Sequence, residues 1–186
     1  MLVRDATVAD MEAVRSIYNS LFDTTTIAWT EEEQTAEQRL AWFSRQTERG
    51  FPVLVADDGG AVVGFAAYGD FRGAGKWLGY RYTVEHTIHV RESHWGAGVG
   101  RLLLQALIER ARAQGMHAMV GAIDGENDAS VRFHERLGFT EVGRMPEIGV
   151  KFGRWLDLIL MQLIVTPMSP PPDGRPTDDE RSDDDD

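Results

Sequence analysis

The sequence predicts an α/β domain with a mixed, mostly antiparallel sheet of about seven strands flanked by about four helices. Two observations predict this class. Strand-like and helix-like segments follow one another in the order β-α-α-β-β-β-α-β-α-β-β, which combines a meander with crossover helices. The chain has 186 residues, of which 42% are hydrophobic, so it can bury one core of ordinary composition.

The first half of the chain is typical of two helices and a run of strands. Thr7 precedes a helix whose apolar residues recur three and four positions apart, and Thr35 starts a second helix that ends near Gly50. Residues 24–30 between them have loop character. Asp58-Gly59-Gly60 is a strong signal for a hairpin turn. The expected strands of this half are residues 2–5, 51–57, 62–69 and 82–90.

The second half alternates strands with helices. A long helix with an apolar face over residues 99–107 stops at Gly115, and a short helix over residues 128–137 is closed by Gly138. The expected strands of this half are residues 117–123, 139–150 and 154–165. We therefore expect one folded domain over residues 1–165.

The last residues differ in character from the rest. Residues 166–186 are rich in proline and carry eight acidic residues against two arginines, so they cannot bury enough apolar surface to order themselves. We expect a disordered tail. An acidic interaction tail is the alternative interpretation of such a run.

Composition excludes several classes of function. The formal net charge of −11 leaves no broad basic surface for nucleic acid or an anionic membrane. The chain has no cysteine, which excludes disulfides, thiol catalysis and cysteine-ligated zinc. No apolar run approaches the roughly 20 residues that cross a bilayer, and the first residues resemble a strand rather than a signal peptide. We expect a cytoplasmic protein.

A glycine-rich segment, residues 94–101, lies between an expected strand and the start of the long helix. Glycine lets a backbone approach a phosphate closely, and the first amides of a helix attract an anion, although a tight turn without a ligand would look similar. A Walker loop would need Gly-Lys-Ser/Thr where Arg101 and Leu102 follow Gly100. A dinucleotide fingerprint would need two residues between its second and third glycines, and here there is one.

The segment Trp95-x-x-Gly98-x-Gly100 resembles the pyrophosphate-binding motif of GNAT acetyltransferases, Gln/Arg-x-x-Gly-x-Gly/Ala. A second signature of that superfamily is similar to the stretch from Asn127 to Phe139, which ends in Leu-Gly-Phe. Within the superfamily the chain is most similar to phosphinothricin and methionine sulfoximine N-acetyltransferases. The strings that carry this finer resemblance are residues 18–19, 68–72, 82–86 and 150–157.

The resemblance implies a GNAT fold in which acetyl-CoA lies in a cleft between the splayed fourth and fifth strands. It implies that backbone groups of one strand end and of the glycine segment hold the cosubstrate. The implied residues are Ile88, His89, Val90, Gly96, Ala97, Gly98, Val99, Gly100, Arg101 and Asn127. The chain departs from the pattern at Trp95, which replaces Gln or Arg, and its loop over residues 71–81 is longer than in these relatives.

Glu85 is the candidate catalytic base. Thr83, Glu85, Thr87 and His89 share one face of an expected central strand, where a carboxylate is costly unless it is paired or functional. A carboxylate on an edge strand facing water is the alternative. By resemblance Glu85 removes the ammonium proton of the acceptor in a direct transfer. His134 is implied to support the reaction as an acid or a CoA contact, while a purely structural histidine remains the alternative.

An aromatic loop is the candidate acceptor pocket. Arginine can clamp a substrate carboxylate bidentately, and aromatic rings can enclose a small side chain. The candidate substrate-binding residues are Phe71, Arg72, Tyr80 and Arg81. Lys151 and Trp155 are further candidates, and the hairpin that contains them is expected at the interface of a homodimer. We expect no metal, because His86 and His89 lie three apart on a strand and face opposite ways.

The acceptor implied by the resemblance is the α-amino group of a small amino-acid-like molecule such as methionine sulfoximine, methionine sulfone or phosphinothricin. One alternative is an acetyltransferase of protein N-termini or ribosomal proteins, which would need an open peptide groove. The other is a non-catalytic domain that only senses acetyl-CoA. Retention of Glu85, Asn127 and the loop glycines argues against the sensor.

Overall fold

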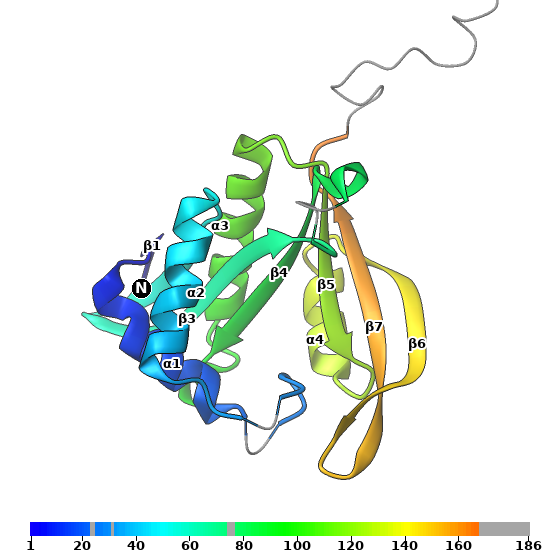
Figure 1. Ribbon diagram of the computed structural model, residues 1–186, viewed down its shortest axis with the longest axis horizontal. Helices are drawn as coiled ribbons and strands as arrows, with labels where there is room; N and C mark the ends of the chain where they lie inside the picture. Colours follow the sequence, from blue (N-terminus) through cyan, green and yellow to red (C-terminus); the bar gives the residue numbers. More distant parts are fainter. Residues whose placement is uncertain (23–24, 31, 74–76, 168–186) are drawn as a thin grey trace, which may run out of the picture.

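The computed structural model describes residues 1–22, 25–30, 32–73 and 77–167. These residues form a seven-stranded sheet with the order β1-β2-β3-β4-β5-β7-β6 and four α-helices, which confirms the expected fold class (Figure 1). The strands are β1 Leu2–Asp5, β2 Val53–Asp58, β3 Ala61–Asp70, β4 Thr83–Val90, β5 Ala118–Asp124, β6 Thr140–Lys151 and β7 Arg154–Ile164. The helices are α1 Met11–Ser20, α2 Ala36–Glu48, α3 Val99–Ala113 and α4 Asp128–Glu135, with short 3-10 turns at Val8–Asp10, Leu78–Tyr80 and Glu92–His94.

Local sequence signals account for most of these boundaries. The Thr35 side chain accepts a hydrogen bond from the Gln38 amide and so caps α2. The hairpin between β2 and β3 turns at Gly59 and Gly60, whose φ angles are +63° and +94°. Strand β2 begins later than expected, because the Phe51 amide bonds to the Gln46 carbonyl and proline comes next in the chain. The expected tail from residue 168 onward lies outside the described residues.

The sheet is mixed because β4 and β5 are parallel while the other neighbouring strands are antiparallel. The parallel pairing runs only from Thr83 opposite Ala118 to His86 opposite Gly121. Beyond this point β4 continues to pair with β3, and β5 continues to pair with β7, so the two strands diverge (Figure 1). We call the point of divergence after His86 and Gly121 the fork.

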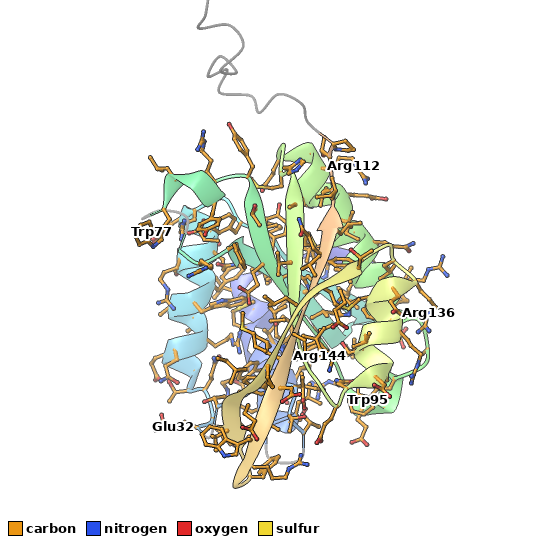
Figure 2. The ribbon with its side chains drawn as sticks, turned by 90° about the vertical axis from the view of Figure 1, so that its right-hand side faces the viewer. Glu32, Trp77, Trp95, Arg112, Arg136 and Arg144 are labelled. Atoms are coloured by element: carbon orange, nitrogen blue, oxygen red, sulfur yellow. The ribbon has the colours of Figure 1, made fainter. Side chains whose placement is uncertain are left out.

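Helices cover both faces of the sheet. Side chains alternate between the faces along each strand, so Val55 and Phe65 pack with α1 while Leu54 and Ala66 pack with α3. Helices α1 and α2 therefore lie on one face, and α3 and α4 lie on the other (Figures 1 and 2). None of the helices in the described part of the chain is both long and apolar enough to span a membrane. The fork therefore lies between α1 and α2 on one face of the sheet and α3 and α4 on the other.

Candidate active site

A cleft of about 800 Å³ lies at the fork, between the end of β4, the start of α3 and one side of α4. All of the cofactor-binding residues expected from the sequence line it, with the exception of Ala97. His94 and Trp95, within the glycine-rich segment identified from the sequence, also line the cleft. Further lining residues on the α1–α2 connection and on or just after α4 were not expected from the sequence. These are Leu21, Ile27, Ala129, Ser130, Phe133, Arg136 and Leu137.

The glycine segment forms an anion-binding corner of this cleft. Gly96 and Gly98 have φ angles of +76° and +82°, a left-handed conformation that other residues rarely adopt. Gly98 is the N-cap of α3 and provides no side-chain hydrogen bond to the helix start. The first amides of α3, from Val99 to Arg101, therefore have no partner within the helix. They lie at the positive end of the helix dipole, which attracts negative charge. This arrangement suits a pyrophosphate.

Trp95 and Ala97 shape this corner without presenting amides to the cleft. The Trp95 indole Nε1 donates to the Val90 carbonyl oxygen at 2.8 Å, which ties the glycine segment to the end of β4. The Ala97 amide donates to the His94 carbonyl at 3.3 Å. Arg136, the C-cap of α4, also lines the cleft, and Figure 2 shows it on the same side of the molecule as Trp95. Together with Arg101 it adds positive charge locally to a protein that is acidic overall.

The α1–α2 connection closes the cleft from the opposite side, and a buried lysine holds it there. Lys151 Nζ, at the end of β6, donates to the carbonyl oxygens of Phe22 at 2.7 Å, Thr25 at 2.8 Å and Ala28 at 2.5 Å. The residue is only 1% exposed. The expectation that Lys151 contacts substrate is therefore wrong: its ammonium group positions the segment that contributes Leu21 and Ile27 to the cleft.

Glu85 lies on β4 just before the fork, on the face covered by α1 and α2. It is paired across the sheet with Gly69 on β3 and Val120 on β5, so no large side chain crowds it from β3. Glu85 remains accessible to solvent, but the protein atoms around it restrict its hydration. This partial desolvation raises the pKa of its carboxyl above the ordinary glutamate value. Such a carboxylate is a better proton acceptor than a fully solvated one.

His134 lies behind the cleft, in the core under α4. Its Nδ1 is 2.7 Å from the Ser130 carbonyl oxygen and must donate to it, so the neutral ring carries no proton on Nε2. Burial lowers the pKa of His134, which favours this neutral form although the Ser130 contact opposes the shift. The ring stacks on His86 with centroids 5.1 Å apart and is only 2% exposed. This geometry favours a role in packing β4 against α4 over that of an acid.

The two strand histidines face opposite sides of β4, as expected. His86 contacts His134 and Phe139, while His89 contacts Tyr18 and Phe65 on the other face. Among the described residues, no group of three or more His, Cys, Asp or Glu side chains is placed to hold a metal ion.

The candidate acceptor residues lie at the opposite end of β4 from the glycine segment. Phe71 and Tyr80 form an edge-to-face pair with centroids 5.5 Å apart, and the Arg72 guanidinium lies 5.9 Å from the Tyr80 ring. Arg81 is exposed but donates from Nη1 to the Leu78 carbonyl at 2.6 Å. Trp77 of the same loop lies on the α2 side of the sheet, the side that Glu85 faces (Figure 2).

Comparisons with known proteins agree with this geometry. Residues 14–139 match the model of the Acetyltransferase (GNAT) family. The chain belongs to the GNAT acetyltransferase family. It is 51% identical over 166 residues to an L-methionine sulfoximine/L-methionine sulfone acetyltransferase of Pseudomonas paraeruginosa, covering 89% of this chain and 95% of that protein.

Solved structures of two other members superpose closely on this GNAT chain. One is a phosphinothricin acetyltransferase from Sinorhizobium meliloti in complex with acetyl-CoA, with a TM-score of 0.84, 33% identity and coverage of 95% and 93% of the two chains. The other is a ribosomal-protein-alanine N-acetyltransferase from Brucella melitensis, with a TM-score of 0.85, 42% identity and coverage of 88% and 99%. This GNAT protein is thus an acetyltransferase, and acetyl-CoA is its cosubstrate.

The glycine segment gives a direct test of how this GNAT enzyme holds acetyl-CoA. Gly98→Ala forces a side chain into a left-handed backbone conformation, a strain of roughly 1–2 kcal/mol that distorts the first amides of α3. We expect the KM for acetyl-CoA to rise about tenfold, since 1.4 kcal/mol corresponds to a factor of ten. The measurement is initial rate against acetyl-CoA concentration.

Gly100→Ala is the matched control. Gly100 has no positive φ, and a Cβ there would meet the Phe133 ring at an ordinary 3.5 Å. Its effect on the KM should be clearly smaller. Equal effects of the two substitutions would mean that space beside the phosphate, rather than the backbone conformation at Gly98, governs binding.

Proposed function

We propose that this enzyme transfers the acetyl group of acetyl-CoA to the α-amino group of a small amino-acid-like acceptor of the methionine sulfoximine, methionine sulfone or phosphinothricin type. The observation that carries the proposal is Glu85: an uncrowded carboxylate with a raised pKa, directly before the fork, on a chain 51% identical to an acetyltransferase of the first two compounds. Retention of this carboxylate together with an intact anion-binding corner supports turnover over mere sensing of acetyl-CoA.

The proposed chemistry is a direct transfer with Glu85 as general base. Glu85 removes one proton from the acceptor ammonium and passes it to solvent, which leaves a neutral amine. The amine nitrogen attacks the thioester carbon, and the carbonyl electron pair moves to oxygen. When the carbonyl re-forms, the C–S bond breaks, and the second proton of the nitrogen ends on the CoA sulfur. Base catalysis of this kind contributes about 10²–10⁴-fold in rate.

The acceptor pocket in this proposal is the aromatic pair Phe71 and Tyr80 with Arg72. Trp77 of the same loop lies on the α2 side of the sheet, the side that Glu85 faces, which supports the assignment (Figure 2). A bound amino acid must present its carboxylate and its amine to the same side. Arg72 is the stronger candidate for the carboxylate, since Arg81 already donates to a carbonyl of its own loop. A guanidinium can bind a carboxylate through two parallel hydrogen bonds.

We also propose that the enzyme is a cytoplasmic homodimer that associates through the β6–β7 hairpin. Strand β6 is an edge of the sheet, and an exposed edge invites pairing or coverage. Large apolar side chains are exposed along this hairpin, which is typical of an interaction surface. They are Val142, Met145, Ile148, Val150, Phe152 and Trp155.

A second candidate function is acetylation of a protein N-terminus. The similarity to the ribosomal-protein-alanine N-acetyltransferase of Brucella melitensis favours it. The two functions differ in the carbonyl group attached to the α-carbon of the acceptor, which is a free carboxylate in an amino acid and part of a peptide bond in a protein.

Substitution of the base tests the mechanism. Glu85→Gln keeps the size and hydrogen-bonding capacity of the side chain but cannot accept the ammonium proton, so kcat should fall about 10²–10⁴-fold. The KM for acetyl-CoA should change little, because the cleft is lined by other residues. Because Glu85 is protonated and inactive below its raised pKa, the wild-type rate should fall as the pH is lowered through that value. The mutant should lack this acid limb and recover rate at high pH, where free amine is more abundant.

His134→Ala is the control for this experiment, and it should cost less in kcat than Glu85→Gln and keep the acid limb. The measurement is kcat and kcat/KM against pH for the three proteins. A Glu85→Gln enzyme with the wild-type kcat and acid limb would show that the base lies elsewhere.

The identity of the acceptor is tested with matched substrates. Methionine sulfone, methionine sulfoximine and phosphinothricin should be acetylated, and converting the carboxylate of the best of them to an amide should cost about 1.5–3 kcal/mol, or ten- to a hundredfold in kcat/KM. Arg72→Ala should cost a similar factor with the acid but little with the amide. Preference for an alanine-starting peptide over all three amino acids would instead support the ribosomal-protein function.

A further inference from the structure

Thr87 lies at the fork, next along its face of β4 to the carboxylate proposed as the base, although it is not among the residues that line the cleft. It is the first residue of β4 beyond the last pair with β5, His86 opposite Gly121, and it shares a face with Glu85. Neighbouring side chains on one face of a strand are roughly 6.6 Å apart, twice the rise per residue. A thioester that reaches the apex of the fork, with its amine acceptor at Glu85, therefore lies beside Thr87.

The Thr87 hydroxyl has one hydrogen-bond partner in the described structure. Its Oγ1 lies 3.0 Å from His89 Nε2. Thr87 is partly exposed, whereas His89 is only 6% exposed and is enclosed by the rings of Tyr18 and Phe65. The direction of the hydrogen bond between these two residues determines what else the hydroxyl can do.

Arg39 places a buried positive charge close to His89. The Arg39 guanidinium lies 4.8 Å from the Tyr18 ring, 4.7 Å from the Trp42 ring and 5.6 Å from the Phe65 ring, and the residue is 3% exposed. Burial lowers the pKa of His89 to about 4, and the charge of Arg39 contributes to that shift. His89 is consequently neutral at physiological pH and carries a single ring proton.

That proton belongs on Nε2. His89 Nδ1 is buried with no hydrogen-bond partner among the described residues. A proton on Nδ1 would be an orphaned buried donor, and orphaned buried N–H groups are rarer than unpaired acceptors. With the proton on Nε2, His89 donates to Thr87 Oγ1. The Thr87 hydrogen is then not used by His89 and can be donated to another acceptor.

We propose that Thr87 is a further catalytic residue, whose hydroxyl, oriented by the buried His89, donates a hydrogen bond to the thioester carbonyl oxygen of acetyl-CoA. When the amine attacks, the electron pair of the C=O double bond moves to this oxygen, and the hydrogen bond strengthens as the negative charge forms. No proton is transferred from Thr87, and the bond weakens again when the C–S bond breaks. The inference rests on the proposed transfer with Glu85 as base.

The test compares Thr87→Val, which has the same shape without the hydroxyl, with Thr87→Ser, which retains it. Removing one donor to a developing oxyanion costs about 10²–10³-fold in kcat. We expect a fall of that order for Thr87→Val, with the KM for acetyl-CoA and the acid limb of the pH–rate profile unchanged. Thr87→Ser should keep most of the activity. His89→Phe, which removes the orienting donor but keeps a ring, should lie between the two.

Infrared difference spectra of bound acetyl-CoA labelled with ¹³C at the thioester carbonyl provide a readout that does not depend on turnover. The C=O stretch should lie at lower frequency in the wild type and Thr87→Ser than in Thr87→Val. If Thr87→Val keeps the wild-type kcat and carbonyl frequency while Glu85→Gln is impaired, the proposal for Thr87 is wrong and the proposed function stands. If Glu85→Gln also retains full activity and its acid limb, the proposed base fails as well.

Discussion

The function of this protein depends on a parallel strand pair that stops after four residues. Strands β4 and β5 are paired from Thr83 and Ala118 to His86 and Gly121 and then diverge, while each remains bonded to its other neighbour. Their inner edges past the fork consequently carry backbone N–H and C=O groups without a strand partner, and such groups need hydrogen bonds. An extended arm that contains amides, such as the pantetheine of acetyl-CoA, suits this gap. The same divergence opens a path from the phosphate corner to the face of Glu85.

The elements around the fork provide different chemical environments for different parts of the substrates. The start of α3, with Arg101 and Arg136, concentrates positive charge in a protein with a net charge of −11. Close to the fork, partial desolvation raises the pKa of the exposed Glu85, and full burial lowers the pKa of His89. A weakly hydrated carboxylate and a neutral imidazole are suited to accept a proton and to direct a hydrogen bond. Lys151 contributes through its contacts alone, by holding the α1–α2 connection over the cleft.

The sequence predicts what is encoded locally. The helix cap at Thr35, the turn at Gly59 and Gly60, and the glycine segment before α3 depend on residues a few positions apart, so their positions could be anticipated to within one or two residues. The alternation of side chains along β4 likewise placed His86 and His89 on opposite faces. The fold class followed from the order of these elements, and the family from motifs that lie within single segments.

Features that depend on distant backbone groups could not be predicted in this way. Lys151 has the charge of a substrate ligand, but its partners are carbonyl oxygens more than 120 residues away, which no side-chain pattern reveals. Phe133 and Leu137 have the spacing of core residues on a helix, yet they line the cleft because α4 lies behind the fork. Arg39 influences the pKa of His89 because α2 places its guanidinium 5.6 Å from the Phe65 ring, which also contacts His89. In each case the strand order and the helix placement had to be known first.

The central claim is that the fork holds acetyl-CoA and the acceptor amine at the same time, so that the acetyl group passes directly between them. Rapid mixing of the enzyme with a stoichiometric amount of acetyl-CoA, followed by thiol detection and intact-protein mass spectrometry, tests this directly. Direct transfer predicts that no CoA is released and the protein mass is unchanged until an amino-acid acceptor is added, after which one thiol appears for each acetylated acceptor. Release of one equivalent of CoA in the absence of acceptor, with a matching acetyl group on the protein, would contradict the account.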